Sequence, residues 1–433
     1  MIDEGSLEEL VSETEFLALL RGRAVPLLRH VRGLQRPEDA AWSKSELSHL
    51  NELAHDLESF LDDFGARSNK AFFHFTELVA SIRGFASVTH TLRHIRTRFR
   101  RYRVDFSDRE LEEFQLESAA TAGFLTRSLD NLFKALIEEA RSLRLDVPGP
   151  SSVPDSVLDD VRHHLPHDID VEGALDEDAA VSQLATKYLA ARDAFEPMRV
   201  ERAIPSNAIR SWVAARLDES KVREVEAHVH GTQARYDTII KNTAVENETL
   251  TRLRGHISVA LHLLEMVTGL IHFYERHESD IRWEAAKERM ARIVDRREVL
   301  ERTVNFCLRF ATTAFDHGKK VAEGVLAQFS QIQELRIPLP KGTSLHARPL
   351  SLLVRIVNHY GTAVEMRLGE ERCNAGSIMQ MIRLAGKNPS TGEVVFVGDA
   401  RTLADVRLLF DHGLGEGSGG VNGLPEGLAY LKG

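Results

Sequence analysis

The chain has 433 residues, of which 43% are apolar and 28% are charged, and its formal net charge is −10. These proportions are typical of a soluble globular protein, and the length predicts two or three domains rather than one core. An acidic majority argues against nucleic acid as the main partner. The two cysteines, Cys307 and Cys373, lie far apart, so neither a disulfide framework nor a thiolate zinc site is indicated.

The N-terminal residues lack the basic and apolar run of a secretory signal, so we expect a cytoplasmic protein. The most apolar long stretch, residues 257–274, is interrupted by His262, Glu265 and His272. Such interruptions are typical of a buried helix in a bundle, and we therefore predict no membrane insertion.

Proline placement divides the rest of the chain. The windows 38–147 and 206–337 contain no proline and are rich in residues that favour helices, so nothing there breaks a helical backbone. We therefore predict a helical bundle over residues 1–146 and a second helical region over 156–332. The proline-rich segment 147–155 is a predicted linker, and residues 155–205 are predicted to hold shorter helices and loops.

The helical region contains one strongly basic run, Arg93 to Arg103. Within it Ile95, Phe99 and Tyr102 form a helical stripe, so we expect the arginines on the opposite, solvated face, paired with nearby acids. Binding of an acidic partner or of nucleic acid is the alternative.

Two groups of histidines also lie in the helical region. His90 and His94 are four residues apart on one predicted helix face, and His163, His164 and His167 precede two aspartates. Neither group shows the Glu-x-x-His pattern, repeated on two helices, of a di-metal bundle. We therefore predict no metal site.

The pattern changes after Gln333. Leu335, Ile337 and Leu339 alternate with other residues, which predicts a strand, and Pro338 and Pro340 restrict that strand to a sheet edge. Helix and strand signals then follow at short intervals to about residue 413. Residues 415–433 are glycine-rich and predicted to form a flexible tail. Their G-x-G-x-x-G string follows a predicted helix rather than a strand, so no dinucleotide site is expected.

A histidine and an arginine stand where the edge strand gives way to an amphipathic helix, in the segment Leu345-His346-Ala347-Arg348-Pro349. The first turn of a helix offers backbone N–H groups without intrahelical partners, and the helix dipole favours an anion there. Arg348 adds a planar set of donors suited to phosphate oxygens. This pattern indicates a site that takes up and holds a phosphoryl group.

This segment, together with 351–354 and 374–379, resembles the HPr family, the histidine phosphocarriers of the bacterial phosphoenolpyruvate-dependent phosphotransferase system. The resemblance covers about residues 335–414, under a fifth of the chain. It implies an α+β open-faced sandwich over residues 333–414, with three helices on a four-stranded antiparallel sheet in the order βαββαβα. The fold class is thus multidomain, an all-α helical region followed by an HPr-like domain.

The resemblance also implies roles for particular residues. His346 is the expected phosphoryl acceptor on a ring nitrogen, and Arg348 is expected to stabilise the phosphoryl group. Ile378 and Met379 match an apolar docking surface, whereas we assign the neighbouring Ile382 to core packing. The family usually has glycine two residues before the histidine, and Ser344 stands there in this chain.

Ser377 matches a position that is phosphorylated as a regulatory switch in some members of the family. A structural reason for a serine is also present, because Ser377 and Gln380, three residues later, form the pattern of a capping box. We therefore predict that Ser377 caps a helix and keep its phosphorylation as a hypothesis.

The sequence predicts a phosphoryl carrier or phosphorylation-responsive regulator in sugar transport. The resemblance implies an enzyme I type phosphotransferase as immediate donor, phosphoenolpyruvate as ultimate donor, a downstream phosphoacceptor protein, and an HPr kinase if Ser377 is modified. We expect a stoichiometric carrier without a cofactor rather than an enzyme with its own turnover. The alternative is a scaffold whose HPr-like domain docks partners without phosphotransfer, and the helical region is a candidate surface for homo-oligomers.

Overall fold

The computed structural model describes residues 11–34, 41–149, 177–240, 247–278, 284–339, 345–388, 392–416 and 420–432. The chain divides into two compact units. The first contains residues 1–168, 196–227 and 258–315, and the second contains residues 169–195, 228–257 and 316–433. Most of the predicted linker 147–155 and all of the histidine group at 163–167 lie outside the described residues.

Up to residue 329, the described residues form helices joined by loops, short 3₁₀ turns and π-helical segments, which confirms the predicted helical region. The helices are α1 (Glu13–Gly33), α2 (Lys44–Asp63), α3 (Phe73–Arg98), α4 (Asp108–Ser142), α5 (Glu177–Phe195), α6 (Ile209–Arg216), α7 (Glu219–Arg235), α8 (Glu248–Glu278), α9 (Glu284–Ile293), α10 (Arg296–Glu301) and α11 (Arg309–Phe329). Shorter helices were expected in 155–205, but α5 alone has 19 residues.

Three long helices of the first unit begin with the same capping device. A serine hydroxyl accepts the backbone N–H three residues later, and the glutamate at that position accepts the serine's own backbone N–H. Each such cap stabilises its helix by about 1 kcal/mol. The pairs are Ser12 with Glu15 in α1, Ser43 with Glu46 in α2, and Ser107 with Glu110 in α4.

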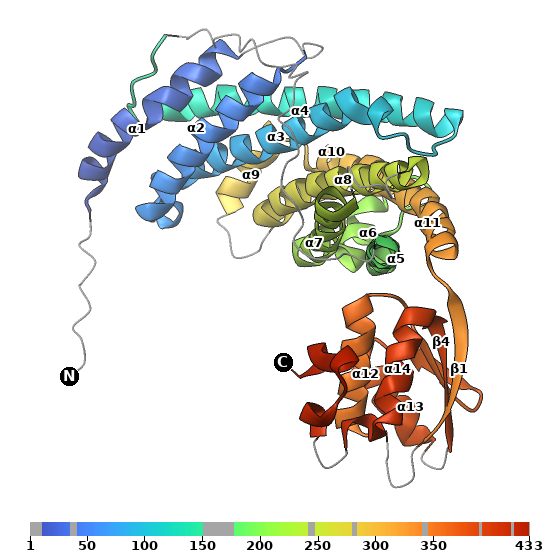
Figure 1. Ribbon diagram of the computed structural model, residues 1–433. Helices are drawn as coiled ribbons and strands as arrows, with labels where there is room; N and C mark the ends of the chain where they lie inside the picture. The colour runs from blue at the N-terminus through green and yellow to red at the C-terminus, as the bar shows by residue number, and fades with distance from the viewer. Residues whose placement is uncertain are drawn as a thin grey trace, which may run out of the picture. The chain divides into compact units, whose positions relative to one another are not determined.

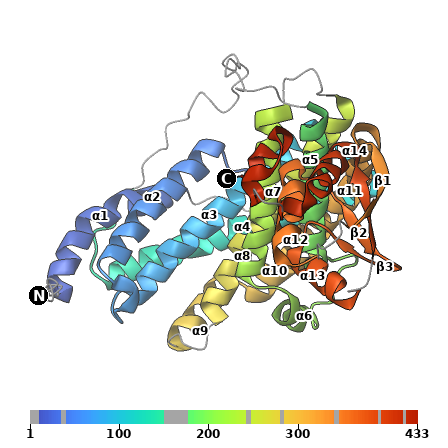
Figure 2. The same cartoon turned by 60° about the horizontal axis from the view of Figure 1, so that its bottom comes forward.

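Helices α1 to α4 lie side by side in the first unit (Figures 1 and 2). The ring of Phe85 on α3 packs edge to face against Phe273 of α8, with ring centroids 5.0 Å apart. Nearby, Arg276 of α8 pairs with the buried Glu77 of α3 at 3.0 Å. Glu77 also lies 3.4 Å from His277, and Arg276 lies 3.9 Å from Glu58, so these buried charged groups form a small network.

One helix among the described residues, Glu248–His277, is long and apolar enough to cross a membrane, with a mean hydropathy of 1.4 in its most apolar window. In the structure 72% of that window is buried. This burial is typical of a core helix in a soluble protein, as the sequence predicted.

The second unit contains the sheet domain together with α5, the end of α7, the start of α8 and most of α11. Arg401 of the domain donates a hydrogen bond from Nη2 to the Phe329 carbonyl at 3.1 Å. The side-chain amide of Gln183 on α5 donates to the His359 carbonyl, also at 3.1 Å. These side-chain bonds fix the sheet domain against helices that precede it in the sequence.

The sheet has four antiparallel strands in the order β1-β4-β2-β3, so β1 is an edge strand as its prolines predicted. Phe396 in β4 pairs with Leu335 on one side and with Met366 on the other, which makes a buried row across the sheet. Gly369 takes a positive φ of 62° in the β2–β3 hairpin. The strands are β1 (Ile332–Pro338), β2 (Glu365–Leu368), β3 (Glu371–Asn374) and β4 (Glu393–Asp399).

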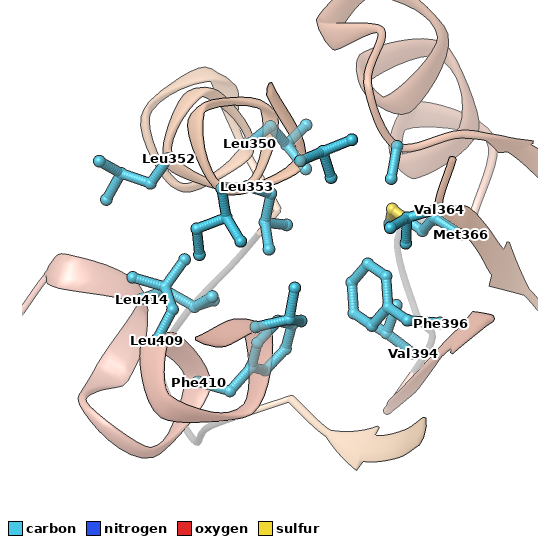
Figure 3. Packing of buried hydrophobic residues seen from close by; sticks show 14 of the residues in the cluster. Leu350, Leu352, Leu353, Val364, Met366, Val394, Phe396, Leu409, Phe410 and Leu414 are labelled. Carbon is cyan, nitrogen blue, oxygen red and sulfur yellow. The ribbon is translucent and has the colours of Figure 1, made fainter. Parts of the chain in front are cut away.

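Three helices cover one face of this sheet (Figures 1 and 2). They are α12 (Ala347–Tyr360), α13 (Ile378–Lys387) and α14 (Ala400–Asp411). The element order is therefore βαββαβα, which confirms the fold that the sequence implied. Leu350 and Leu353 of α12 are fully buried and lie over the sheet side chains Met366 and Phe396, as Figure 3 shows.

The glycine-rich tail is not a flexible appendage in its described part, which corrects our prediction. After α14 the chain reverses through Gly413 and Gly415, whose φ angles are 64° and 72° and therefore favour glycine. Residues 420–423 and 426–431 form 3₁₀ turns, and Leu428 and Leu431 are fully buried in the core of the sheet domain.

Polar contacts also attach the tail to α12 and α14. Arg355 of α12 donates to the carbonyls of Leu431 and Tyr430, at 2.8 and 3.1 Å. The Tyr430 hydroxyl donates to the Asp405 carboxylate of α14 at 2.7 Å, and burial together with this carboxylate raises the pKa of Tyr430. The tail is thus a structural part of the domain.

The buried position of Leu428 predicts that Leu428→Ala destabilises the sheet domain by about 3 kcal/mol, because it leaves a cavity in the core. Amide hydrogen exchange in α12 and α14 of the full chain measures this loss. Met379→Ala, at a side chain that is 72% exposed, is the control and should leave exchange nearly unchanged. Equal protection in the two variants would show that the tail does not support the core.

Candidate functional site

His346 is the N-cap residue of α12. Its backbone is extended, and its imidazole Nδ1 accepts the backbone N–H of Arg348 at 3.4 Å. The ring thereby occupies the place of an ordinary capping side chain and satisfies one of the amides that a helix start leaves without a partner. Its side chain is 48% exposed, so solvent or a partner protein can reach it.

A carboxylate from the tail holds the other side of the ring. His346 Nε2 lies 3.1 Å from Glu416 Oε1, and the Glu416 side chain is 26% exposed. The turn at Gly413 and Gly415 positions Glu416 just before the tail continues. The two ring nitrogens therefore have different partners, a donor at Nδ1 and an acceptor at Nε2.

These two contacts select one neutral tautomer of His346. A nitrogen that accepts an N–H must carry a lone pair, so Nδ1 is unprotonated. A carboxylate accepts a hydrogen, so the proton of the neutral ring lies on Nε2. An imidazole in this form carries its nucleophilic lone pair on Nδ1, at the start of α12.

Arg348 lies in the first turn of α12 and is exposed. Its guanidinium lies close to Gly420 of the tail. A Cβ atom placed on that glycine would lie only 3.2 Å from Nη2 of Arg348. The backbone carbonyl of Arg348 accepts the Ser351 hydroxyl at 2.6 Å. The helix start and the tail thus place His346 and a cationic group near one another.

Ser377 is the N-cap of α13, and its hydroxyl accepts the Gln380 backbone N–H at 3.5 Å. The cap confirms the structural half of the prediction. The reciprocal half differs, because the Gln380 side chain accepts the backbone N–H of Asn374 at 3.2 Å instead of that of Ser377. Gln380 therefore ties the end of β3 to the start of α13.

The apolar residues of α13 divide between core and surface. Met381 and Leu384 are buried, whereas Met379 is 72% exposed and Ile378 is half-buried against the core. Ile382 is 39% exposed, so our assignment of Ile382 to core packing was wrong. Met381 fills the core because it lies on the face of the helix that meets the sheet.

The remaining predicted residues lie elsewhere. His94 of α3 packs edge to face on His262 of α8, whose Nδ1 lies 3.0 Å from Glu265, and burial lowers the pKa of His94 to about 4. Within the described residues, no group of three or more metal-ligating side chains is present. Ser344, the departure from the family pattern before His346, lies outside the described residues.

Glu416 is the functional candidate that sequence reasoning missed. It stands between two glycines in a stretch that resembles a linker, and its side chain meets His346 only because the chain reverses after α14. A lone acidic residue within a glycine-rich turn is the one sequence signal, and such residues are common in loops.

Residues 333–405 match the family model described as "PTS HPr component phosphorylation site". No curated protein and no solved structure gives a significant match to the chain. The match and the βαββαβα sandwich agree over the same residues, and the helical remainder has no family match. The chain therefore carries an HPr-like domain at its C-terminus, joined to a helical region without a family match.

Proposed function

We propose that this protein is a phosphoryl carrier in which Nδ1 of His346 accepts a phosphoryl group from an enzyme I type phosphotransferase, with phosphoenolpyruvate as the ultimate donor. The main support for this proposal is the tautomer of His346. The contacts with the Arg348 amide and with Glu416 together leave the nucleophilic lone pair on Nδ1. The family match over residues 333–405 supports the same type of role.

The transfer exchanges one bond to phosphorus for another. The Nδ1 lone pair forms a bond to phosphorus while the bond between phosphorus and the donor group breaks, and Nε2 keeps its proton toward Glu416. The Arg348 amide then exchanges its bond to Nδ1 for one to a phosphoryl oxygen. The start of α12 and the Arg348 guanidinium favour the new negative charge there.

The site should bind the phosphoryl group weakly enough to release it. The acceptor ring is half-exposed, and Arg348 is exposed as well. An exposed ion pair contributes little net free energy, so the phosphoryl group is stabilised without being trapped. This balance suits onward transfer to a downstream phosphoacceptor protein and a stoichiometric role without a cofactor.

The apolar side chains on α13 are the proposed contact surface for these partners. Met379 is 72% exposed and Ile382 is 39% exposed. Exposed large apolar side chains beside one another favour binding to another protein. The same surface serves the alternative function, a scaffold that docks without phosphotransfer, so phosphate labelling separates the two. Both functions place the protein in the cytoplasm, where the phosphotransferase system operates.

Phosphoryl acceptance is tested by incubating the full chain with enzyme I and labelled phosphoenolpyruvate. We expect an acid-labile label, because phosphorus bonded to an imidazole nitrogen is lost in acid, and we expect His346→Ala to abolish it. His412→Ala, which removes another exposed histidine of the same domain, should keep the label. Equal labelling of the His346→Ala variant, or no label on the natural chain, would refute the carrier function.

The tautomer argument predicts a graded effect at Glu416. Glu416→Ala removes the acceptor at Nε2, so the ring can place its proton on Nδ1, and phosphorylation should slow by about two- to tenfold. Glu416→Gln should recover most of the rate, because its amide oxygen can accept the same proton. Nitrogen NMR of His346 reports the tautomer directly.

The matched control for Glu416 is Glu426→Ala, which removes an exposed carboxylate from the same tail. Its rate and its His346 tautomer should equal those of the natural chain. An unchanged tautomer in Glu416→Ala would show that the carboxylate does not position the ring.

We further propose that Ser377 is open to phosphorylation by an HPr kinase, since a phosphate is tolerated at a helix N-terminus.

Independently of that role, Ser377→Ala should weaken the start of α13 by about 1 kcal/mol, which corresponds to about fivefold faster exchange of the first α13 amides. Ser377→Asp retains a capping oxygen and should exchange at the natural rate. Identical exchange in Ser377→Ala would show that the long 3.5 Å contact contributes nothing.

A further inference from the structure

A half-open groove of about 850 Å³ lies between α3 and α4 in the first unit, and the proposed phosphotransfer does not use it. Trp42 and Ala41, which precede α2, close one side. Ligand sites of proteins commonly have volumes of about 300–1,000 Å³. The groove is thus large enough for a small organic molecule.

Small residues on α4 create the hollow. Ala119, Ala122 and Gly123 line the groove, and their short side chains leave space beside the wider residues of α3. Their spacing of three and four residues places them on one face of α4. This face of α4 forms the floor of the groove. It is apolar and therefore suits the apolar part of a ligand.

The wall formed by α3 is cationic. Arg93 and Arg96 both line the groove, and their separation by three residues places them on the same helix face. No aspartate or glutamate lies among the residues that line it. Two arginines on one side of the groove make that side positively charged, in a chain whose net charge is −10.

Two glutamates of α4 pair with arginines outside this basic run. On α4, Glu113 pairs with Arg309 at 3.3 Å and Glu117 pairs with Arg302 at 3.2 Å. Arg96 is exposed and forms no ion pair within the described part of the chain. The prediction that the arginines pair with nearby acids is therefore wrong for Arg96, which faces the groove with its charge uncompensated.

The groove is also pre-formed. Arg93 Nε donates to the Trp42 carbonyl at 2.9 Å, and the Trp42 indole donates to the Thr126 hydroxyl at 3.0 Å. Trp42 is only 7% exposed. These bonds join the segment before α2 to α3 and to α4. A ligand therefore does not have to order this segment when it binds.

We propose that this groove binds a small organic anion, with a phosphate or carboxylate head held by Arg96 and Arg93 and an apolar body over Trp42 and the small residues of α4. Guanidinium groups donate two parallel hydrogen bonds to either head group. Complementary charge and an apolar floor act together, so neither part of the ligand alone should bind as well.

Isothermal titration of the full chain with four probes tests this. Octyl phosphate and octanoate carry both features with different heads, 1-octanol lacks the charge, and inorganic phosphate lacks the apolar body. We expect one or both amphipathic anions to bind one per chain and to change the tryptophan fluorescence, and the tighter of the two identifies the head group. Equal binding of 1-octanol, or of inorganic phosphate, would overturn the proposal.

Variants then locate the site. Arg96→Gln should weaken binding about tenfold through loss of a charged hydrogen bond, and Ala119→Phe should abolish binding by filling the groove. Both positions are exposed, so both chains should fold, which circular dichroism verifies. Arg100→Gln is the matched control at an exposed arginine that does not line the groove, and it should bind normally.

Binding that survives both Arg96→Gln and Ala119→Phe would place the ligand elsewhere and refute the assignment. The same is true if none of the four probes binds. Because these substitutions lie outside the HPr-like domain, labelling of His346 is a separate readout, and either result can fail without the other.

Discussion

Burial of one face of α12 is the constraint on which the proposed acceptor site depends. Leu350 and Leu353 are fully buried over the sheet, and Val357 continues the stripe one turn later. Successive helical residues are turned by about 100°, so a shift of one residue would lift this stripe off the core. The core therefore fixes the position of α12 along the sequence. His346 stands at its start and is its N-cap.

Local patterns together with the family resemblance predicted the elements of the sheet domain, and its edge strand followed from the prolines. The tail was mispredicted because glycine content is a local property, whereas burial of Leu428 and Leu431 depends on a surface built by α12 and α14. Glu416 was missed for the same reason, since its contact with His346 spans 70 residues of sequence. Residues that act through the fold cannot be recognised from their neighbours in the chain.

Helix α13 shows a different limit of sequence reasoning. It has ten residues and apolar side chains around more than one face, so periodicity alone does not reveal which face meets the sheet. The cap at Ser377 fixes the start of the helix and therefore its rotation, which turns Met381 and Leu384 inward and leaves Met379 and Ile382 outside. The exposure of Met379 and Ile382, and with it the proposed contact surface, follows from that rotation.

The two proposed sites require opposite properties of their cations. A carrier must release what it accepts, and a half-exposed histidine with one exposed arginine supplies only modest stabilisation. The groove combines two arginines with an apolar floor and therefore favours retention of a ligand. Such a ligand affects phosphoryl acceptance only if it binds two states of the chain unequally.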